Sequence, residues 1–410
     1  MQSLVNMKME DSCTMPATHR MGKISEGTLF YAFVFLCLFY AGYFYLVGIE
    51  NGELQGSHLF SYIKEAFLWL LLAVAYVQTE DKRRLFVRHR CLLISLCLLV
   101  GVAVVKSLLA TDLSFLLSIK TLLLMAGFFI LFYDTKISLS SLSKAFYVVL
   151  LVQIPIVSIN AQSDQWGEQA FGTLANPTAL AFFICFCSFL LFQEKSVYRC
   201  LVLFCPWMIY LTDSFAGLIV LVAQMGVALA LSLLSGKQRG NALLLILGFV
   251  IASLFMPLRF ERLYIFCVDM VMNLYSALPF TGAEAGSNRL DTLSISVRAE
   301  QAEALYSSFQ PGFVLWGAPA FKPFDSALVS FLWNFGLLVF LPMLVPVIRG
   351  GADWLRSLAV RPYYLVGLLP IFLFLSVIRI HIFHSFWICI IVLLLMMRRD
   401  REVNREVTNP

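Results

Sequence analysis

Residues 287–319, SNRLDTLSISVRAEQAEALYSSFQPGFVLWGAP, gather side chains that could bind an anion and move a proton. Arg289 and Arg298 carry planar guanidinium forks that bind two oxygens at once and stay charged at any working pH. Asp325, a few residues further on, could accept a hydroxyl proton as a general base. The alternative for the arginines is a solvated amphipathic helix, on which residues nine positions apart point in roughly opposite directions.

A second set of polar residues lies inside or beside long apolar runs, where a charge is costly and is by default a functional hypothesis. Lys120 is the hardest to dismiss, because it follows Asp112 by eight residues and so lies about 12 Å below the expected membrane boundary. Its ammonium needs a polar cavity or an anion. Snorkelling to the headgroups is the alternative for those near helix ends. The set comprises Lys64 with Glu65, Lys120, Asn160, Asn176, Asp213, Asp325, Asn334, Arg379, His381 and His384.

The sequence contains little that indicates a metal site or a cofactor site. His381 and His384 are spaced as a metal pair could be, but no third ligand follows at suggestive spacing, so a capping or hydrogen-bonding role is favoured. Of the ten cysteines, only Cys267 falls clearly in a predicted outside segment, so no internal disulfide is expected there. No phosphate-binding loop, dinucleotide fingerprint or metalloprotease motif appears. We therefore expect no metal and no cofactor.

The elements that must position these side chains are membrane helices. The chain has 410 residues, of which 60% are hydrophobic and 13% charged, and its mean hydropathy is +0.83. An ordinary soluble domain is nearer 45–50% apolar, so the composition excludes that class and predicts an all-α, polytopic membrane protein. The net charge of +5 does not indicate a nucleic-acid partner, because the basic residues lie mostly between apolar runs, where they orient helices.

About twelve apolar runs are long enough to cross roughly 30 Å of hydrocarbon as helices. They divide the chain into a tail (1–28), nine spans within 29–256, a large loop (257–325), three spans within 326–397 and a second tail (398–410). Within the loop, residues 256–280 are apolar enough for a further span, but we expect an amphipathic or re-entrant helix instead. The predicted spans are 29–47, 60–78, 91–106, 112–133, 142–159, 176–192, 198–212, 215–234, 241–256, 326–347, 363–379 and 381–397.

The Lys and Arg residues set the expected orientation. With the N-terminus in the cytoplasm, 21 of the 30 basic residues fall in inside segments, and the positive-inside rule therefore places both termini in the cytoplasm. The large loop and the polar residues of the second set then lie toward the outer face. An outward-facing polar cavity covered by one large loop suits an enzyme that acts on lipid-linked substrates at the outer leaflet.

Three segments resemble the O-antigen polymerase and O-antigen ligase superfamily. FGTLANPTALAFFICF is similar to the family's G-x-x-x-N-P-N helix start, and LTDSFAGLIVLVA is similar to its T-x-S-R-G helix. VRAEQAEALYSSFQPGFVLWGAPAFKPFDSALVSFLWNFGLLVFL resembles the closing module, an arginine-led helix, a Pro/Gly turn and an apolar helix. The resemblance covers residues 165–395. Thr178 stands where the family often has a second Asn, and Phe215 where it often has Arg.

The resemblance implies a glycosyltransferase that moves a glycan from undecaprenyl pyrophosphate to a sugar hydroxyl at the periplasmic face of the bacterial inner membrane, without nucleotide or metal. Arg298, with Arg289 as the alternate, would stabilise the departing diphosphate, and Asp325 would be the base. Asp325 stands where ligases often have His, which favours a polymerase. The residues expected to bind substrate are Lys120, Asn176, Asp213, Trp316, Arg379, His381 and His384.

Two other functions stay open. An O-antigen ligase would transfer the glycan to lipid A-core, and a secondary transporter or lipid-linked oligosaccharide flippase could also have twelve spans. Transporters of this size often consist of two related halves, and no such repeat is evident here. The expected partners are the undecaprenyl-pyrophosphate-linked glycan, the lipid bilayer and a chain-length-regulating membrane protein, with no nucleic acid.

Overall fold

The chain folds into a bundle of helices in the computed structural model. The structure describes residues 25–39, 57–133, 139–160, 172–174, 176–212, 214–235, 239–255, 303, 307, 310–322, 324, 326–377 and 384–408. Within these ranges every regular element is a helix, which confirms the all-α class. The elements are α1 (Glu26–Leu38), α2 (Ser57–Gln78), α3 (Lys82–Arg88), α4 (Arg90–Ala110), α5 (Ser114–Phe132), α6 (Leu139–Asn160), η3 (Gly172–Leu174), α7 (Pro177–Phe192), η4 (Val197–Leu203), α8 (Phe204–Thr212), α9 (Phe215–Ser235), α10 (Arg239–Phe255), α13 (Pro311–Trp316), α14 (Ala327–Val360), α15 (Tyr364–Val377) and α16 (His384–Thr408).

Length and composition identify a membrane-embedded protein. In the described ranges, five helices are long and apolar enough to cross a bilayer, and further apolar helices are shorter. Large apolar side chains also cover the outside of the bundle: on α4, Leu108 and Leu109 are 72% and 76% exposed. A soluble protein rarely exposes such a surface, whereas lipid tails would cover it. The five long segments are Arg90–Ala110, Ser114–Phe132, Leu142–Ile159, Ala216–Leu234 and Ala327–Pro346.

The described part of each predicted span is largely helical, although several boundaries differ. α1 ends at Leu38, and the rest of the predicted 29–47 span lies outside the described residues, as does the predicted re-entrant helix. The span at 198–212 is the 3-10 turn η4 followed by α8. α14 and α16 continue to Val360 and Thr408, beyond the predicted ends at 347 and 397. Gly350 and Gly351 are a helix stop signal that α14 passes through, whereas no Gly or Pro interrupts 398–408.

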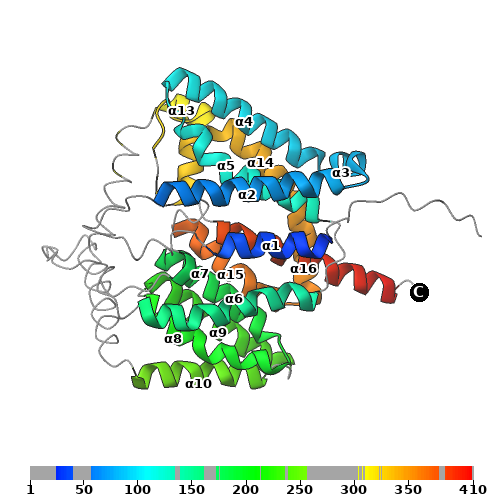
Figure 1. Ribbon diagram of the computed structural model, residues 1–410, viewed down its shortest axis with the longest axis vertical. Coiled ribbons are helices and arrows are strands. Elements are labelled where there is room, and N and C mark those ends of the chain that lie inside the picture. Colours follow the sequence, from blue (N-terminus) through cyan, green and yellow to red (C-terminus); the bar gives the residue numbers. More distant parts are fainter. Residues whose placement is uncertain are drawn as a thin grey trace, which may run out of the picture.

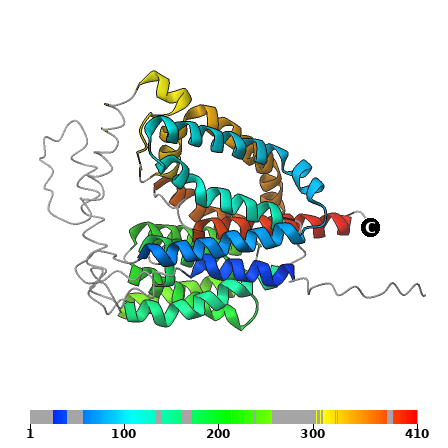
Figure 2. The ribbon, with the colours of Figure 1, turned by 45° about the horizontal axis from the view of Figure 1, so that its top comes forward.

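The bundle has two distinct ends (Figure 1). α3 and the C-terminal part of α16 lie at one end, and α13 lies at the other. α4, α5 and α14 stand together on one side, as a second view also shows (Figure 2), and α4 packs against both α5 and α14. α7 forms the centre of the other side, where it contacts α8, α9, α15 and α16. Every α7 residue from 179 to 192 is buried, as expected of a helix that is apolar all round.

Buried amides cross-link the helices around α7. Gln224 on α9 is 1% exposed, and its Nε2 donates to the carbonyls of Cys185 (3.1 Å) and Val366 (2.7 Å).

After α7, Glu194 Oε1 accepts from the backbone N–H groups of Lys195 (2.9 Å) and Ser196 (3.0 Å). Burial favours the protonated carboxyl, but these hydrogen bonds outweigh it and hold the pKa of Glu194 below its usual value. The turn after α7 is thus fixed by its own carboxylate.

Candidate functional site

Lys120 forms an ion pair inside the bundle. It lies in α5, and its Nζ is 2.8 Å from Oε1 and 2.9 Å from Oε2 of Glu65 on α2. The Lys120 side chain is 38% exposed and that of Glu65 17%, so the pair is partly screened. The ring of Tyr62, one turn before Glu65, lies 6.0 Å from the Lys120 ammonium. The anion that the depth of Lys120 requires is therefore supplied by the protein itself.

Two further basic groups accompany this pair. Lys64, next to Glu65 on α2, is 6% exposed, and His384 begins α16, which packs against α1 and α5. We call Lys64, Glu65 and Lys120 the lysine cluster. Its two ammonium groups are of the kind that could hold an anionic group of a substrate.

Asn176 has a capping role at the start of α7. Its Oδ1 accepts from the N–H of Ala179 at 3.0 Å, and Pro177 occupies the first helical position. The preceding turn, η3, is buried. Thr173 receives a side-chain hydrogen bond from Gln153 on α6, and its own hydroxyl donates to the carbonyl of Leu38, the last residue of α1.

Gly172 lets this turn approach α6. Its φ is +54°, and a Cβ there would lie 2.2 Å from Gln153 Oε1.

α1 has 13 residues and rises about 20 Å, which is less than the thickness of the hydrocarbon core of a bilayer. The end of α1 and the η3 turn therefore place hydrogen-bonded, non-helical backbone within the bundle.

A break in α14 forms a second buried polar region. Gly336 has φ +65° and ψ −178°, which interrupts the helix, and a Cβ on it would lie 2.4 Å from the carbonyl oxygen of Leu315. Gly317, after α13, has φ +81° and packs as closely on the carbonyl of Asn334. The N–H of Ala318 donates to the carbonyl of Trp333 at 2.7 Å. α13 and the break in α14 are thus interlocked through two glycines.

Lys106 on α4 is hydrogen-bonded to both sides of this interlock. It is 2% exposed, and its Nζ donates to the carbonyls of Ala318 (2.9 Å) and Asn334 (2.6 Å) while lying 5.2 Å from the ring centroid of Phe115. A buried charge is tolerated when carbonyl dipoles and an aromatic face surround it. Sequence reasoning placed Lys106 at the last position of a span and gave it no role. The only available signal was a charge following an otherwise apolar run.

Asn334 and Trp316 complete this region. The Asn334 side chain donates to the carbonyls of Lys322 (2.8 Å) and Ser330 (2.7 Å) and accepts from the N–H of Lys322 (2.9 Å). Trp316, the last residue of α13, is 39% exposed beside the interlock. The Trp316 side chain is therefore partly accessible to a substrate.

The predicted site is only partly within the described residues. Lys120 lies in the lysine cluster and His384 begins α16, while Asn176 caps α7 and Trp316 stands at the α13–α14 interlock. Among the described residues, no group of three or more His, Cys, Asp or Glu side chains could hold a metal ion. The remaining predicted residues lie outside the described ranges: Arg289, Arg298, Asp325, Asp213, Arg379 and His381.

These features define the class as a helical membrane protein with polar groups buried between its helices. No protein-family model, no curated protein and no solved structure matches the chain.

Proposed function

We propose that this protein is a membrane glycosyltransferase that polymerises undecaprenyl-pyrophosphate-linked oligosaccharide repeat units. In this proposal the chain crosses the bacterial inner membrane about twelve times, with both termini in the cytoplasm and residues 257–325 on the periplasmic face. Arg298, with Arg289 as the alternate, stabilises the departing diphosphate, and Asp325 removes the proton from the acceptor hydroxyl.

One observation carries the proposal. Two of the three segments that resemble the family contain tight, hydrogen-bonded turns beside helices. Gly172 and Asn176 build the turn before α7, and Gly317 and Gly336 build the α13–α14 interlock. Non-helical backbone at membrane depth is tolerated where protein buries it or where it lines a water-filled cavity. The ammonium groups of the lysine cluster are also compatible with an anionic diphosphate substrate.

The first experiment is deletion of the gene in its native host, followed by electrophoresis of the surface polysaccharide. Loss of a polymerase leaves lipid A-core carrying one repeat unit. Loss of a ligase leaves lipid A-core with none, which would favour the alternative function within the same family. An unchanged polysaccharide pattern would contradict both.

Transport is the second candidate, because α14 is broken at Gly336 and discontinuous helices form the substrate sites of many transporters. Vesicles that contain the purified protein and a labelled lipid-linked repeat unit separate the two functions. A glycosyltransferase converts the label into a ladder of longer products. A flippase changes the leaflet in which the label resides and leaves its length unchanged.

A further inference from the structure

The link between α2 and α4 forms the short helix α3 at the end of the bundle opposite α13 (Figure 1). Asp81 begins it, since its Oδ1 accepts from the N–H of Arg84 at 2.9 Å, and His89 ends it. Seven residues rise about 10 Å, far too little to cross a bilayer. Leu85 is 7% exposed and anchors the helix, while Phe86 and Val87 are 50% and 63% exposed. α3 therefore shows apolar and basic side chains together at the bundle end.

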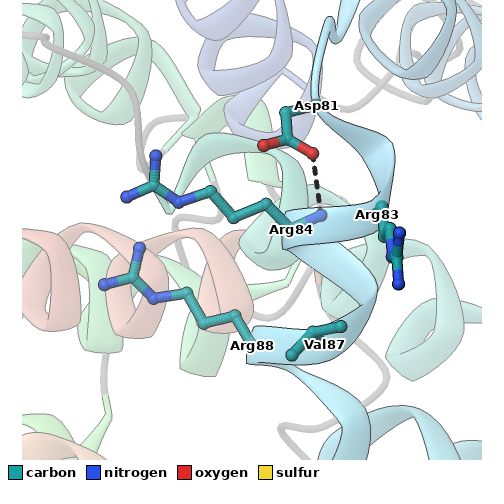
Figure 3. A pocket seen from close by; sticks show the side chains of 5 residues that line it. All are labelled: Asp81, Arg83, Arg84, Val87 and Arg88. Atoms are coloured by element: carbon teal, nitrogen blue, oxygen red, sulfur yellow. Dashed lines mark hydrogen bonds between the residues drawn. The ribbon is translucent and has the colours of Figure 1, made fainter.

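A hollow of about 420 Å³ lies on α3. It is lined by Asp81, Arg83, Arg84, Val87 and Arg88, which we call the arginine hollow. The side chains of Arg84 and Arg88 extend side by side from one face of the helix, one turn apart, and Arg83 stands on another face (Figure 3). Most of the lining is apolar, as Val87 and the aliphatic stems of the arginines provide. Guanidinium groups and apolar surface thus share one small site.

The neighbouring helices hold Arg88 in place. Its guanidinium lies 5.0 Å from the ring centroid of Tyr133, and that of Arg398 on α16 lies 4.0 Å from the same ring. Arg398 Nη1 also donates to the carbonyl of Tyr133. The buried ring of His89 meets the Tyr133 ring edge-on at 4.9 Å. The arginine hollow is therefore continuous with a cation–aromatic stack that joins α3, α5 and α16.

We infer that the arginine hollow binds the phosphodiester headgroup of an anionic glycerophospholipid. Residues 80–90 contain five basic and two acidic side chains, a net charge of +3 at the level where helix ends meet headgroups. Arg84 and Arg88 bind the phosphate oxygens, because guanidinium forks bind phosphate in a two-pronged way. The exposed Val87, which lines the hollow, contacts the first carbons of the acyl chains. A free inorganic phosphate would make no use of this apolar surface.

The test uses the full-length protein purified in detergent, with phosphatidylglycerol as the anionic probe and phosphatidylcholine as the zwitterionic reference. Native mass spectrometry measures the affinity for each lipid. The wild type should prefer phosphatidylglycerol, and the Arg84→Gln/Arg88→Gln variant should bind it about 30-fold more weakly, with phosphatidylcholine unchanged. Unchanged phosphatidylglycerol affinity in this variant would overturn the inference.

The matched control is Lys195→Gln/Arg199→Gln, which removes two exposed charges from the turn after α7. It should leave the affinity for phosphatidylglycerol within about twofold. An equal loss in the control would mean that the lipid responds only to total charge, and would contradict a defined site. A large excess of inorganic phosphate should not displace the lipid. Displacement would show that the hollow takes the free anion instead.

A second variant covers the case in which the Gln protein fails to insert, since these arginines also contribute to topology. Arg84→Lys/Arg88→Lys keeps both charges but replaces each planar fork by a point charge. Its affinity for phosphatidylglycerol should fall several-fold. Wild-type affinity in this variant would overturn the two-pronged binding. The inference does not depend on the glycosyltransferase proposal, because lipid binding is measured without any donor substrate.

Discussion

At the scale of the residue, Lys120 shows what could be predicted from the sequence and what could not. Its depth in an apolar run predicted that the ammonium needs a polar cavity or an anion, and the structure supplies Glu65. The partner itself could not be inferred, because Glu65 is 55 residues away in the chain and only helix packing joins them. Asn176 was predicted to start a helix and does so by capping α7.

The ion pair gives a prediction at this scale. Lys120→Met removes the ammonium that pairs directly with Glu65, so thermal stability in detergent should fall, whereas Lys120→Met/Glu65→Gln removes both charges of the pair and should recover most of it. The coupling energy between the two sites should be about 1 kcal/mol, since the Lys120 side chain is 38% exposed and the pair is partly screened. Additive effects of the two substitutions would contradict a direct pair.

The same two variants also separate structure from function. Under the proposed function, the double variant should be stable and yet form little polymer, because the lysine cluster has lost an ammonium group. Full polymer formation by the stable double variant would assign Lys120 a purely structural role.

At the scale of the element, the helices were predictable and their breaks were not. Apolar runs of about 20 residues predict helices because every backbone group in lipid must be paired within its own segment. Gly336 stands inside such a run, in NFGLLVF, and glycine alone does not predict a break. The break depends on two distant groups, α13 and Lys106 on α4, that supply close packing and donors.

Substitution of Gly336 tests the interlock. Gly336→Ala should destabilise the protein by about 2–4 kcal/mol, because φ +65° disfavours a Cβ and that atom would lie 2.4 Å from the Leu315 carbonyl. Gly101→Ala is the matched control, since Gly101 lies within α4 and a Cβ there meets nothing within 4 Å. The control should be neutral or stabilising by up to about 1 kcal/mol. The measurement is the thermal unfolding of both variants in detergent. Equal stability of Gly336→Ala and Gly101→Ala would contradict the interlock.

At the scale of the whole molecule, composition and hydropathy predicted the class, and the five long apolar helices confirm a membrane-embedded, all-α protein. The mutual arrangement of the helices could not be read from the sequence. α4 and α14 pack together although more than 200 residues separate them, because an apolar cluster that includes Leu99 and Val339 joins them and Lys106 donates to the carbonyl of Asn334.

The predicted orientation has a direct test. Reporter fusions at residue 240 and at the C-terminus should report the cytoplasm, and a fusion near residue 300 should report the periplasm, because 21 of the 30 Lys and Arg residues fall on the predicted inside. Reporter enzymes active in only one compartment supply the measurement. A cytoplasmic signal at residue 300 would remove Arg289 and Arg298 from the outer face and would contradict the proposed function.

The bonds of Lys106 also constrain how the protein is made. Its acceptors on Ala318 and Asn334 are synthesised 212 and 228 residues after it. At about 5–20 residues per second, α4 waits in the membrane for about 10–40 s with a lysine whose native acceptors do not yet exist. Lys106 lies four residues before the end of α4, so in the isolated helix its side chain can extend to the headgroups. Each nascent chain thus passes through a stage in which the Lys106 ammonium has surroundings different from its native ones, until α14 arrives.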